Sequence, residues 1–379
     1  MFSMKVDFNR LSITGHELEF IQQAIDSGHL QGGGKFLAKC ESAISDIVGA
    51  TSLMTTSCTT ALDMIALLLD IKEGDEIIVP SYTFVSSINP FVLRGAKPVF
   101  CDSRADTLNI DETKIENLIT DKTKAIVAVH YAGVACEMDT IMAIAKRRKI
   151  AVVEDTAQGL YAYYKGKHLG TFGELGAISF HSTKNVIAGE GGALICNNPN
   201  FIDRANFVRE KGTNRIHFIN GKIDKYTWVD YGSSYIPSEL ITAFLSAQLM
   251  CAKKFTDARI ASWNYYYDNL SELEREGKIR LCKVPNGCKH NAHIFWATTD
   301  SAETTKSLLQ YLKSKQIGAT QHYAPLHNCP MAKKLGCADI SLPVAETFAK
   351  TMFRLPIYST ITPDEQDYVI KAIFDFFKK

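Results

Sequence analysis

Residues 151–158 read AVVEDTAQ, an apolar run that ends in two carboxylates and is followed by small side chains. The run is short and rich in valine, which is typical of a strand buried on both faces of a sheet. Ligands of open α/β sheets bind at the carboxyl ends of the parallel strands. Asp155 therefore either serves a ligand or caps a following helix, and this stretch alone favours neither interpretation.

Similar apolar runs lie on both sides of this stretch. They occur at 76–79, 97–101, 125–129, 177–180 and 193–196, and helical patterns occupy 59–69 and 139–148. This alternation predicts an α/β fold with a mostly parallel sheet wrapped by helices.

The later part of the chain has a different pattern. Long helical patterns over 238–254 and 258–273 are followed by a mixed order at 292–299, 304–315, 318–323 and 364–377. A chain of 379 residues suits a large domain plus a smaller one. We expect a large domain, with the N-terminal segment, over residues 1–250 and a small C-terminal α+β domain over 251–379.

The composition is that of an ordinary globular protein, 46% hydrophobic and 22% charged. The 42 basic and 41 acidic residues leave a net charge of +1, which gives no electrostatic case for binding nucleic acid or a membrane surface. No apolar stretch approaches the ~20 residues of a membrane span. The ten cysteines form no C-x-x-C pair, so we expect reduced thiols, no metal site and a cytoplasmic protein.

Residues 177–192 read AISFHSTKNVIAGEGG and contain a lysine in an unusual setting. An isolated loop lysine is usually solvated. Lys184, however, follows an apolar strand and precedes glycines at 189, 191 and 192, where a backbone must turn tightly near something bulky. One further strand separates Lys184 from Asp155, so both side chains can reach one crevice.

Residues 55–62 read TTSCTTAL and lead into the helical pattern at 59–69. Ser57, Cys58 and Thr59 would offer hydroxyls, free N–H groups and the positive end of a helix dipole, which suits a phosphate. Serine and threonine are also the commonest helix caps, so this signal is weak by itself.

Together, a phosphate cradle, a strand-end aspartate and a lysine in a buried setting are what pyridoxal 5′-phosphate requires. Asp155 would keep the pyridine nitrogen protonated. Lys184 would hold the cofactor as a Schiff base and then move the substrate proton.

The chain resembles the DegT/StrS family of nucleotide-sugar aminotransferases, which are fold-type-I pyridoxal-phosphate enzymes. The resemblance covers nearly the whole chain and rests on PSYTFVSS (80–87), VVEDTAQ (152–158), SFHSTKN (179–185), GEGG (189–192) and RLPIY (354–358). Within the family, HYAGVACEMDT (130–140), MDTIMAIAK (138–146), REKGTNR (209–215) and DKYTW (224–228) are most similar to the enzymes of enterobacterial common antigen synthesis.

The resemblance implies a role for each matching residue. Lys184 matches the Schiff-base lysine, and Asp155 matches the partner of the pyridine nitrogen. The other implied cofactor contacts are Gln158 near the phenolic oxygen, Phe84 on the ring face, and Ser57, Cys58, Thr59 and Ser179 at the phosphate. The implied product is dTDP-4-amino-4,6-dideoxygalactose, made from a dTDP-linked 4-keto-6-deoxyglucose and L-glutamate for a surface polysaccharide such as O antigen of lipopolysaccharide.

Several alternatives stay open under this resemblance. The gluco epimer of the product, a C3 aminotransferase and a cofactor-binding regulator without turnover are the rivals. Related sugar 3-dehydratases carry histidine at the lysine position or an extra cysteine cluster, so Lys184 favours transamination. Arg215, His322 and His327 are candidate contacts to the sugar nucleotide.

The family also implies a homodimer with shared active sites. Many members carry an asparagine that reaches the neighbouring subunit's phosphate, whereas Tyr235 is followed here by Ile236. We therefore expect Ser233 or Ser234 to make that contact.

Overall fold

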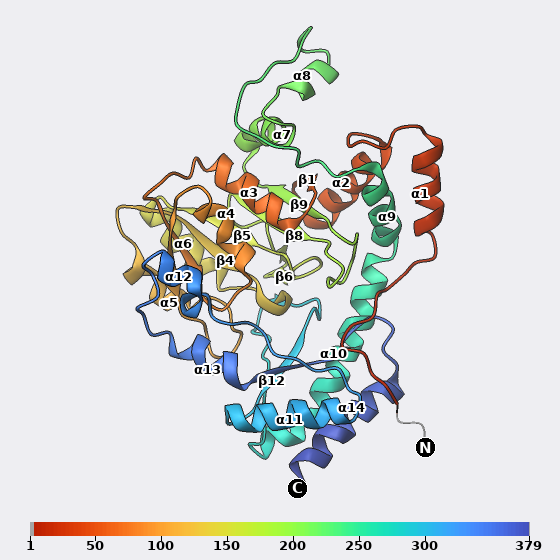
Figure 1. Ribbon diagram of the computed structural model, residues 1–379, viewed down its shortest axis with the longest axis vertical. Helices are drawn as coiled ribbons and strands as arrows, with labels where there is room; N and C mark the ends of the chain where they lie inside the picture. Colours follow the sequence, from red (N-terminus) through yellow and green to blue (C-terminus); the bar gives the residue numbers. More distant parts are fainter. Residues whose placement is uncertain (1–3, 379) are drawn as a thin grey trace.

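The computed structural model describes residues 4–378 and centres on a seven-stranded sheet (Figure 1). Its order is β1-β9-β8-β5-β4-β2-β3, and only β9 runs against the others. The strands are β1 (Thr51–Thr55), β2 (Glu76–Pro80), β3 (Lys97–Cys101), β4 (Thr123–Val129), β5 (Ala151–Asp155), β8 (Leu175–Ser179) and β9 (Gly192–Cys196). The predicted mostly parallel sheet is confirmed, although the sequence did not predict β1.

The following helices cover this sheet or pack against the helices that cover it. They are α1 (Glu17–Asp26), α2 (Lys35–Val48), α3 (Cys58–Leu68), α4 (Asn89–Val92), α5 (Glu112–Ile115), α6 (Met138–Arg148), α7 (Ile202–Arg209) and α9 (Glu239–Met250). Helix α3 packs against β8 and β9 and is buried on nearly every side, because its apolar residues do not keep to one face. Helix α9 packs against α1 and α2.

The C-terminal region builds a second, antiparallel sheet. Helix α10 (Ala252–Arg275) leads to β10 (Arg280–Leu281), β12 (Phe295–Thr298) and β13 (Met352–Leu355), with β12 in the middle. Helices α11 (Ala302–Ser314), α12 (Pro330–Lys334), α13 (Pro343–Thr351) and α14 (Pro363–Phe377) accompany it, and Figure 1 shows α11 beside α14. Residues 318–323, one of the segments of mixed order, form only a single bridge, from Thr320 to Arg354.

A third, small sheet of β11 (Cys288–Lys289), β6 (Tyr163–Tyr164) and β7 (Lys167–His168) joins segments of both regions. The segment before α1 lies against the C-terminal region, where Val6 forms a parallel β-bridge with Ile317. The boundary between a large and a small domain at residue 250 stays a proposal. Along residues 4–378, no helix has the length and apolar character needed to cross a bilayer.

One segment stands away from the body of the protein. Residues 210–235, which include α8 (Arg215–Ile219), project at the top of Figure 1. Most of their aromatic side chains are exposed, among them Trp228 at 78% and Tyr231 at 67%, whereas Tyr235 is half-buried.

Candidate active site

A cavity of about 430 Å³ lies at the carboxyl ends of β5 and β8. Every residue that the sequence assigned to the cofactor lines it: Ser57, Cys58, Thr59, Phe84, Asp155, Gln158, Ser179 and Lys184. A larger hollow of about 870 Å³ lies near the amino ends of β4 and β5 and contains none of them. The smaller cavity is therefore the candidate active site.

The start of α3 forms one end of the cavity. The Ser57 hydroxyl accepts a hydrogen bond from the Thr60 backbone N–H at 3.1 Å, and the Thr60 hydroxyl accepts one from the Ser57 N–H at 2.9 Å. The N–H groups of Cys58 and Thr59 come before the first intrahelical donor, so they can bind an anion. This end of the cavity suits a phosphate.

Gly192 lets β9 pass directly behind this turn. A Cβ at residue 192 would lie 2.3 Å from the Cys58 nitrogen, closer than atoms can approach without movement of the backbone. Only glycine therefore fits the strand against the helix start in this arrangement.

Gly192→Ala is expected to weaken pyridoxal phosphate binding at least about tenfold, because the added methyl displaces the Cys58 N–H; overpacking of this kind costs about 1–3 kcal/mol. Titration of the apoprotein with the cofactor measures this. Gly191→Ala is the matched control, since its Cβ would meet only side-chain carbons, Ala188 Cβ at 3.1 Å and Phe180 Cβ at 3.4 Å. Equal affinity of Gly192→Ala and wild type would contradict the assignment of the cradle.

Asp155 ends β5 and is 6% exposed. Its Oδ2 accepts a hydrogen bond from the Ser87 hydroxyl at 2.6 Å, and its Oδ1 accepts one from the Ala157 N–H at 3.1 Å. The Ser87 hydroxyl also lies 2.8 Å from the Thr83 hydroxyl. These contacts fix the carboxylate and leave it capacity to accept a hydrogen bond from a ring N–H.

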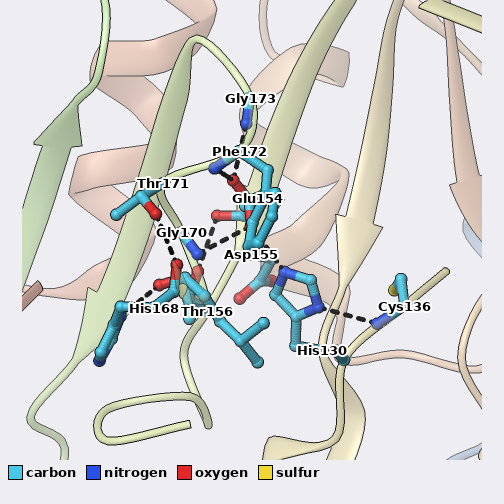
Figure 2. A network of polar contacts seen from close by, with 12 residues as sticks. His130, Cys136, Glu154, Asp155, Thr156, His168, Gly170, Thr171, Phe172 and Gly173 are labelled. Atoms are coloured by element: carbon cyan, nitrogen blue, oxygen red, sulfur yellow. Dashed lines mark hydrogen bonds and ion pairs between the residues drawn. The ribbon is translucent and has the colours of Figure 1, made fainter. Parts of the chain in front are cut away.

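Glu154 precedes Asp155 and, because neighbouring side chains of a strand alternate, points to the other face of the sheet; Figure 2 shows its polar contacts. Its fully buried carboxylate accepts hydrogen bonds from the N–H groups of Gly170, Phe172 and Gly173 at 2.6–2.8 Å and from His130 Nε2 at 2.9 Å. His130 Nδ1 accepts from the Cys136 N–H at 3.2 Å, which puts the ring proton on Nε2. The network anchors the strand end that carries Asp155.

Glu154→Gln is expected to destabilise the fold by about 3 kcal/mol, because the new amide N–H would face a donor N–H of Gly170 or His130. The midpoint of thermal unfolding measures this, with the exposed Glu303→Gln as control. An unchanged midpoint would show that the network does not hold the strand.

The same network predicts acid sensitivity. Burial acts to raise the pKa of Glu154, but His130 and the N–H groups of Gly173 and Gly170 outweigh it, so the pKa lies below its usual 4.5. A lowered folded-state pKa contributes stability that is present above pH 4.5 and is lost as the pH falls through that lower value. Unfolding midpoints between pH 6 and 3 should fall more steeply for wild type than for Glu154→Gln.

Lys184 follows β8 in a loop closed by backbone hydrogen bonds from Phe180 to Gly191 and from Ser182 to Gly189. Burial lowers the pKa of its amine, the nearby Cys58 and Asp155 oppose that change, and the charge of Arg354 reinforces it. A lowered pKa favours the neutral, nucleophilic amine.

The residue after Lys184 is also held firmly. The Asn185 amide donates to the Asn291 carbonyl at 2.9 Å, and its oxygen lies 3.0 Å from His293 Nδ1. Sequence reasoning did not single out these residues, because their pairing spans more than 100 positions.

Gln158, Ser179 and Phe84 complete the predicted set. Gln158 Oε1 accepts a hydrogen bond from the Ala132 N–H at 2.6 Å, and the Ser179 hydroxyl accepts one from the His181 N–H at 3.3 Å. Phe84 is 56% exposed, and its ring centroid lies 6.2 Å from that of Tyr323. This half-exposed aromatic forms part of the cavity wall.

The three predicted sugar contacts lie in different places. His322 lines the cavity and stacks on Tyr323 with ring centroids 4.0 Å apart; burial, with the charge of Arg354, lowers its pKa to about 2, so the ring is neutral. Arg215 lies on the projecting segment, outside the cavity of its own chain.

His327 does not fit the predicted contact. Its ring is fully buried, with Nδ1 2.7 Å from the Ser81 hydroxyl and Nε2 3.2 Å from Glu346. Because both nitrogens are engaged, its role in this arrangement is to join two segments of the fold.

The residues present fit pyridoxal phosphate. A helix start suits the phosphate, a fixed carboxylate suits the pyridine nitrogen, and a lysine of lowered pKa suits the aldehyde carbon. A mostly parallel sheet with these groups at the strand ends defines a fold-type-I pyridoxal-phosphate enzyme.

Comparison with known proteins extends this assignment. A sequence profile of the DegT/DnrJ/EryC1/StrS aminotransferase family matches residues 12–374. GDP-perosamine synthase of Escherichia coli O157:H7 is 30% identical over 97% of both chains. Among solved structures, the S. venezuelae protein DesV is 27% identical with a TM-score of 0.90, and the aminotransferase TlmJ of Streptoalloteichus hindustanus is 26% identical with a TM-score of 0.89. Each match covers 99% of both chains.

The chain belongs to the DegT/DnrJ/EryC1/StrS aminotransferase family. It is a pyridoxal-phosphate-dependent sugar aminotransferase.

Proposed function

We propose that this protein transfers the amino group of L-glutamate to C4 of dTDP-4-dehydro-6-deoxy-D-glucose and forms dTDP-4-amino-4,6-dideoxygalactose. The observation that carries the chemistry is the convergence of Lys184, Asp155 and the α3 cradle in one cavity. The choice of sugar rests on the similarity of residues 130–140, 209–215 and 224–228 to enzymes of enterobacterial common antigen synthesis. The product would serve that antigen or a related surface polysaccharide.

Each part of the cavity has a task in this reaction. When bound, the cofactor supplies an electron-withdrawing ring that allows an amino group and a proton to move between two substrates. The Cys58 and Thr59 N–H groups bind its phosphate, and Asp155 keeps the proton on the ring nitrogen. Lys184 Nζ removes a proton from the donor carbon and later delivers one to C4 of the sugar.

The proposed setting is the cytoplasm, and the proposed assembly is a homodimer. The ten free cysteines fit a reducing compartment. Exposed aromatic residues on the projecting segment suit a partner surface formed by a second copy. Ile236 packs on Gly32 of its own chain. Ser233 or Ser234 is therefore proposed to contact the phosphate of the cofactor that the partner subunit binds. Sedimentation should give a mass of twice 42.1 kDa.

A GDP-linked sugar is the second candidate substrate, because the similar E. coli protein is named GDP-perosamine synthase. We therefore suggest offering dTDP- and GDP-linked 4-keto-6-deoxy sugars in parallel with L-glutamate and analysing the products by NMR. The proposal predicts faster turnover of the dTDP sugar and a small coupling between H3 and H4, which marks an axial C4 amine. A preferred GDP sugar, a large coupling or an amine at C3 would identify one of the alternatives. Absence of any amino sugar would refute the function.

A further inference from the structure

The 290–294 loop joins β11 to β12 and is mostly buried. Within it, Ala292 adopts a left-handed backbone conformation with a φ of 52°, which residues other than glycine rarely adopt. Buried Arg259 of α10 donates hydrogen bonds to the carbonyls of Ala292 and His293, at 3.1 and 2.7 Å, and keeps the loop in this shape. Backbone strain that the surroundings hold in this way is concentrated at functional sites.

Asn291 attaches this loop to two segments of the large sheet. Its side-chain amide donates to the Gln158 carbonyl at 2.7 Å and to the Leu160 carbonyl at 2.8 Å. Its backbone carbonyl accepts a hydrogen bond from the Asn185 amide at 2.9 Å. This one residue of the loop therefore contacts the segment after β5 and the segment after β8, and both of these segments carry side chains that line the active-site cavity.

His293 makes a second contact between the loop and the segment after β8. Its Nδ1 lies 3.0 Å from Asn185 Oδ1. Because the Asn185 amide nitrogen donates to the Asn291 carbonyl, the oxygen is the atom that faces His293, and the ring proton must be on Nδ1. Burial, together with the charges of Lys184 and Arg259, lowers the pKa of His293 well below its usual 6.5, so the ring is neutral and Nδ1–H is its one donor group.

This contact bears on Lys184 because Asn185 is the next residue in the chain. Lys184 Nζ stands at the end of a flexible four-carbon side chain, so its position depends on how firmly the neighbouring backbone is held. Lys184, Asn185 and His293 also line one small cavity of about 10 Å³. Little free space therefore separates the lysine from the loop, and a displacement of Asn185 would be transmitted to the lysine.

We propose that His293 is a positioning residue for Lys184: its Nδ1–H group holds the Asn185 oxygen and thereby fixes the backbone from which the Lys184 amine reaches the cofactor. Asn291 ties the same loop to the segment after Asp155, so the loop keeps the lysine and the carboxylate at a constant separation. This inference rests on the proposed function, which makes Lys184 the cofactor lysine. It does not depend on which sugar is aminated, because attachment of the cofactor requires no sugar.

The test measures how fast pyridoxal phosphate becomes attached to Lys184. Apoprotein is mixed with the cofactor, and the visible absorbance of the attached form is followed by stopped flow. His293→Leu should slow attachment about 10- to 100-fold, because a misplaced amine seldom meets the aldehyde carbon in a reactive geometry. The affinity for pyridoxamine 5′-phosphate, which has no aldehyde, should change less than about threefold, since the α3 cradle and Asp155 bind it without Lys184.

Three further variants identify the hydrogen bond as the cause. His293→Asn places an amide N–H where the Nδ1–H group stands, so its attachment rate should return to within about threefold of wild type. Asn185→Ala removes the same contact from the other side, and adding His293→Leu to it should slow attachment little further. His290→Leu is the control within the loop, since His290 packs on Trp263 with ring centroids 4.4 Å apart, and it should behave as wild type.

Attachment by His293→Leu at the wild-type rate would overturn the proposal. Equal slowing in His293→Leu and His293→Asn, or an equal loss of affinity for pyridoxamine 5′-phosphate, would also overturn it, because either result would mean that the ring serves only in packing. If the His293 variants do not fold, Asn185→Ala decides, and an unchanged attachment rate there would contradict the proposal. A wild type that attaches the cofactor to Lys184 but aminates no sugar would refute the proposed function separately.

Discussion

Lys184→Ala is expected to lower kcat/KM for amino transfer on the order of 10⁴-fold or more, the largest effect of any single substitution. The variant loses both the amine that bonds to the cofactor and the group that moves the substrate proton. It should still bind pyridoxal phosphate, because the α3 cradle and Asp155 remain. Its absorbance should match free cofactor, and borohydride should fix no cofactor to the chain.

The exposed Lys278→Ala provides the control and should behave as wild type. Mass spectrometry of the borohydride-reduced wild type should place the cofactor on the peptide that contains Lys184. A cofactor-bearing peptide from another lysine would show that the anchor has been misassigned.

Asp155→Asn is expected to lower kcat about 10²- to 10³-fold, since it removes one preorganised charge from the reacting centre. Asparagine retains the size of the side chain and can still bond to Ser87 and the Ala157 N–H, so the fold should persist. The ring nitrogen then loses the carboxylate that stabilises its proton, and proton removal from the donor carbon slows.

The glutamate half-reaction in single turnover measures this effect directly. Asp121→Asn, at an exposed position, is the control for loss of a carboxylate elsewhere. A half-reaction as fast as that of wild type would mean that the Asp155 carboxylate has no role in the reaction and that Asp155 is only the last residue of β5.

Much of the central fold could be predicted because its signals are local. The valine-rich run before Asp155 and the similar apolar runs can each be recognised from neighbouring residues, because strands β2 to β5 are only five to seven residues long. These strands begin and end close to the expected positions. Strand β1, TSLMT, was missed because it is half polar and pairs with β9, about 140 positions later. Residues 318–323, one of the segments of mixed order, pair only through Thr320, and His322 and Tyr323 of this segment line the cavity.

The predicted cofactor residues converge because most follow strands or start a helix at one edge of the sheet. Local sequence patterns could not predict the contacts between segments that are distant along the chain. His322 and His327 are five positions apart in HYAPLH, yet one lines the cavity and the other is fully buried. The sequence pattern predicted no role for Glu154 beyond its position next to Asp155. Its bonds to Gly170 and Gly173 depend on a loop whose path no local pattern specifies.

The most direct measurement is the transfer of label from ¹⁵N-glutamate to dTDP-4-dehydro-6-deoxy-D-glucose by wild type and Lys184→Ala. Wild-type enzyme should give a dTDP-amino sugar with ¹⁵N bonded to C4, and the variant should give none within the same time. A wild-type product without ¹⁵N, or equal labelling by the variant, would contradict the account of this cavity as an aminotransferase site centred on Lys184.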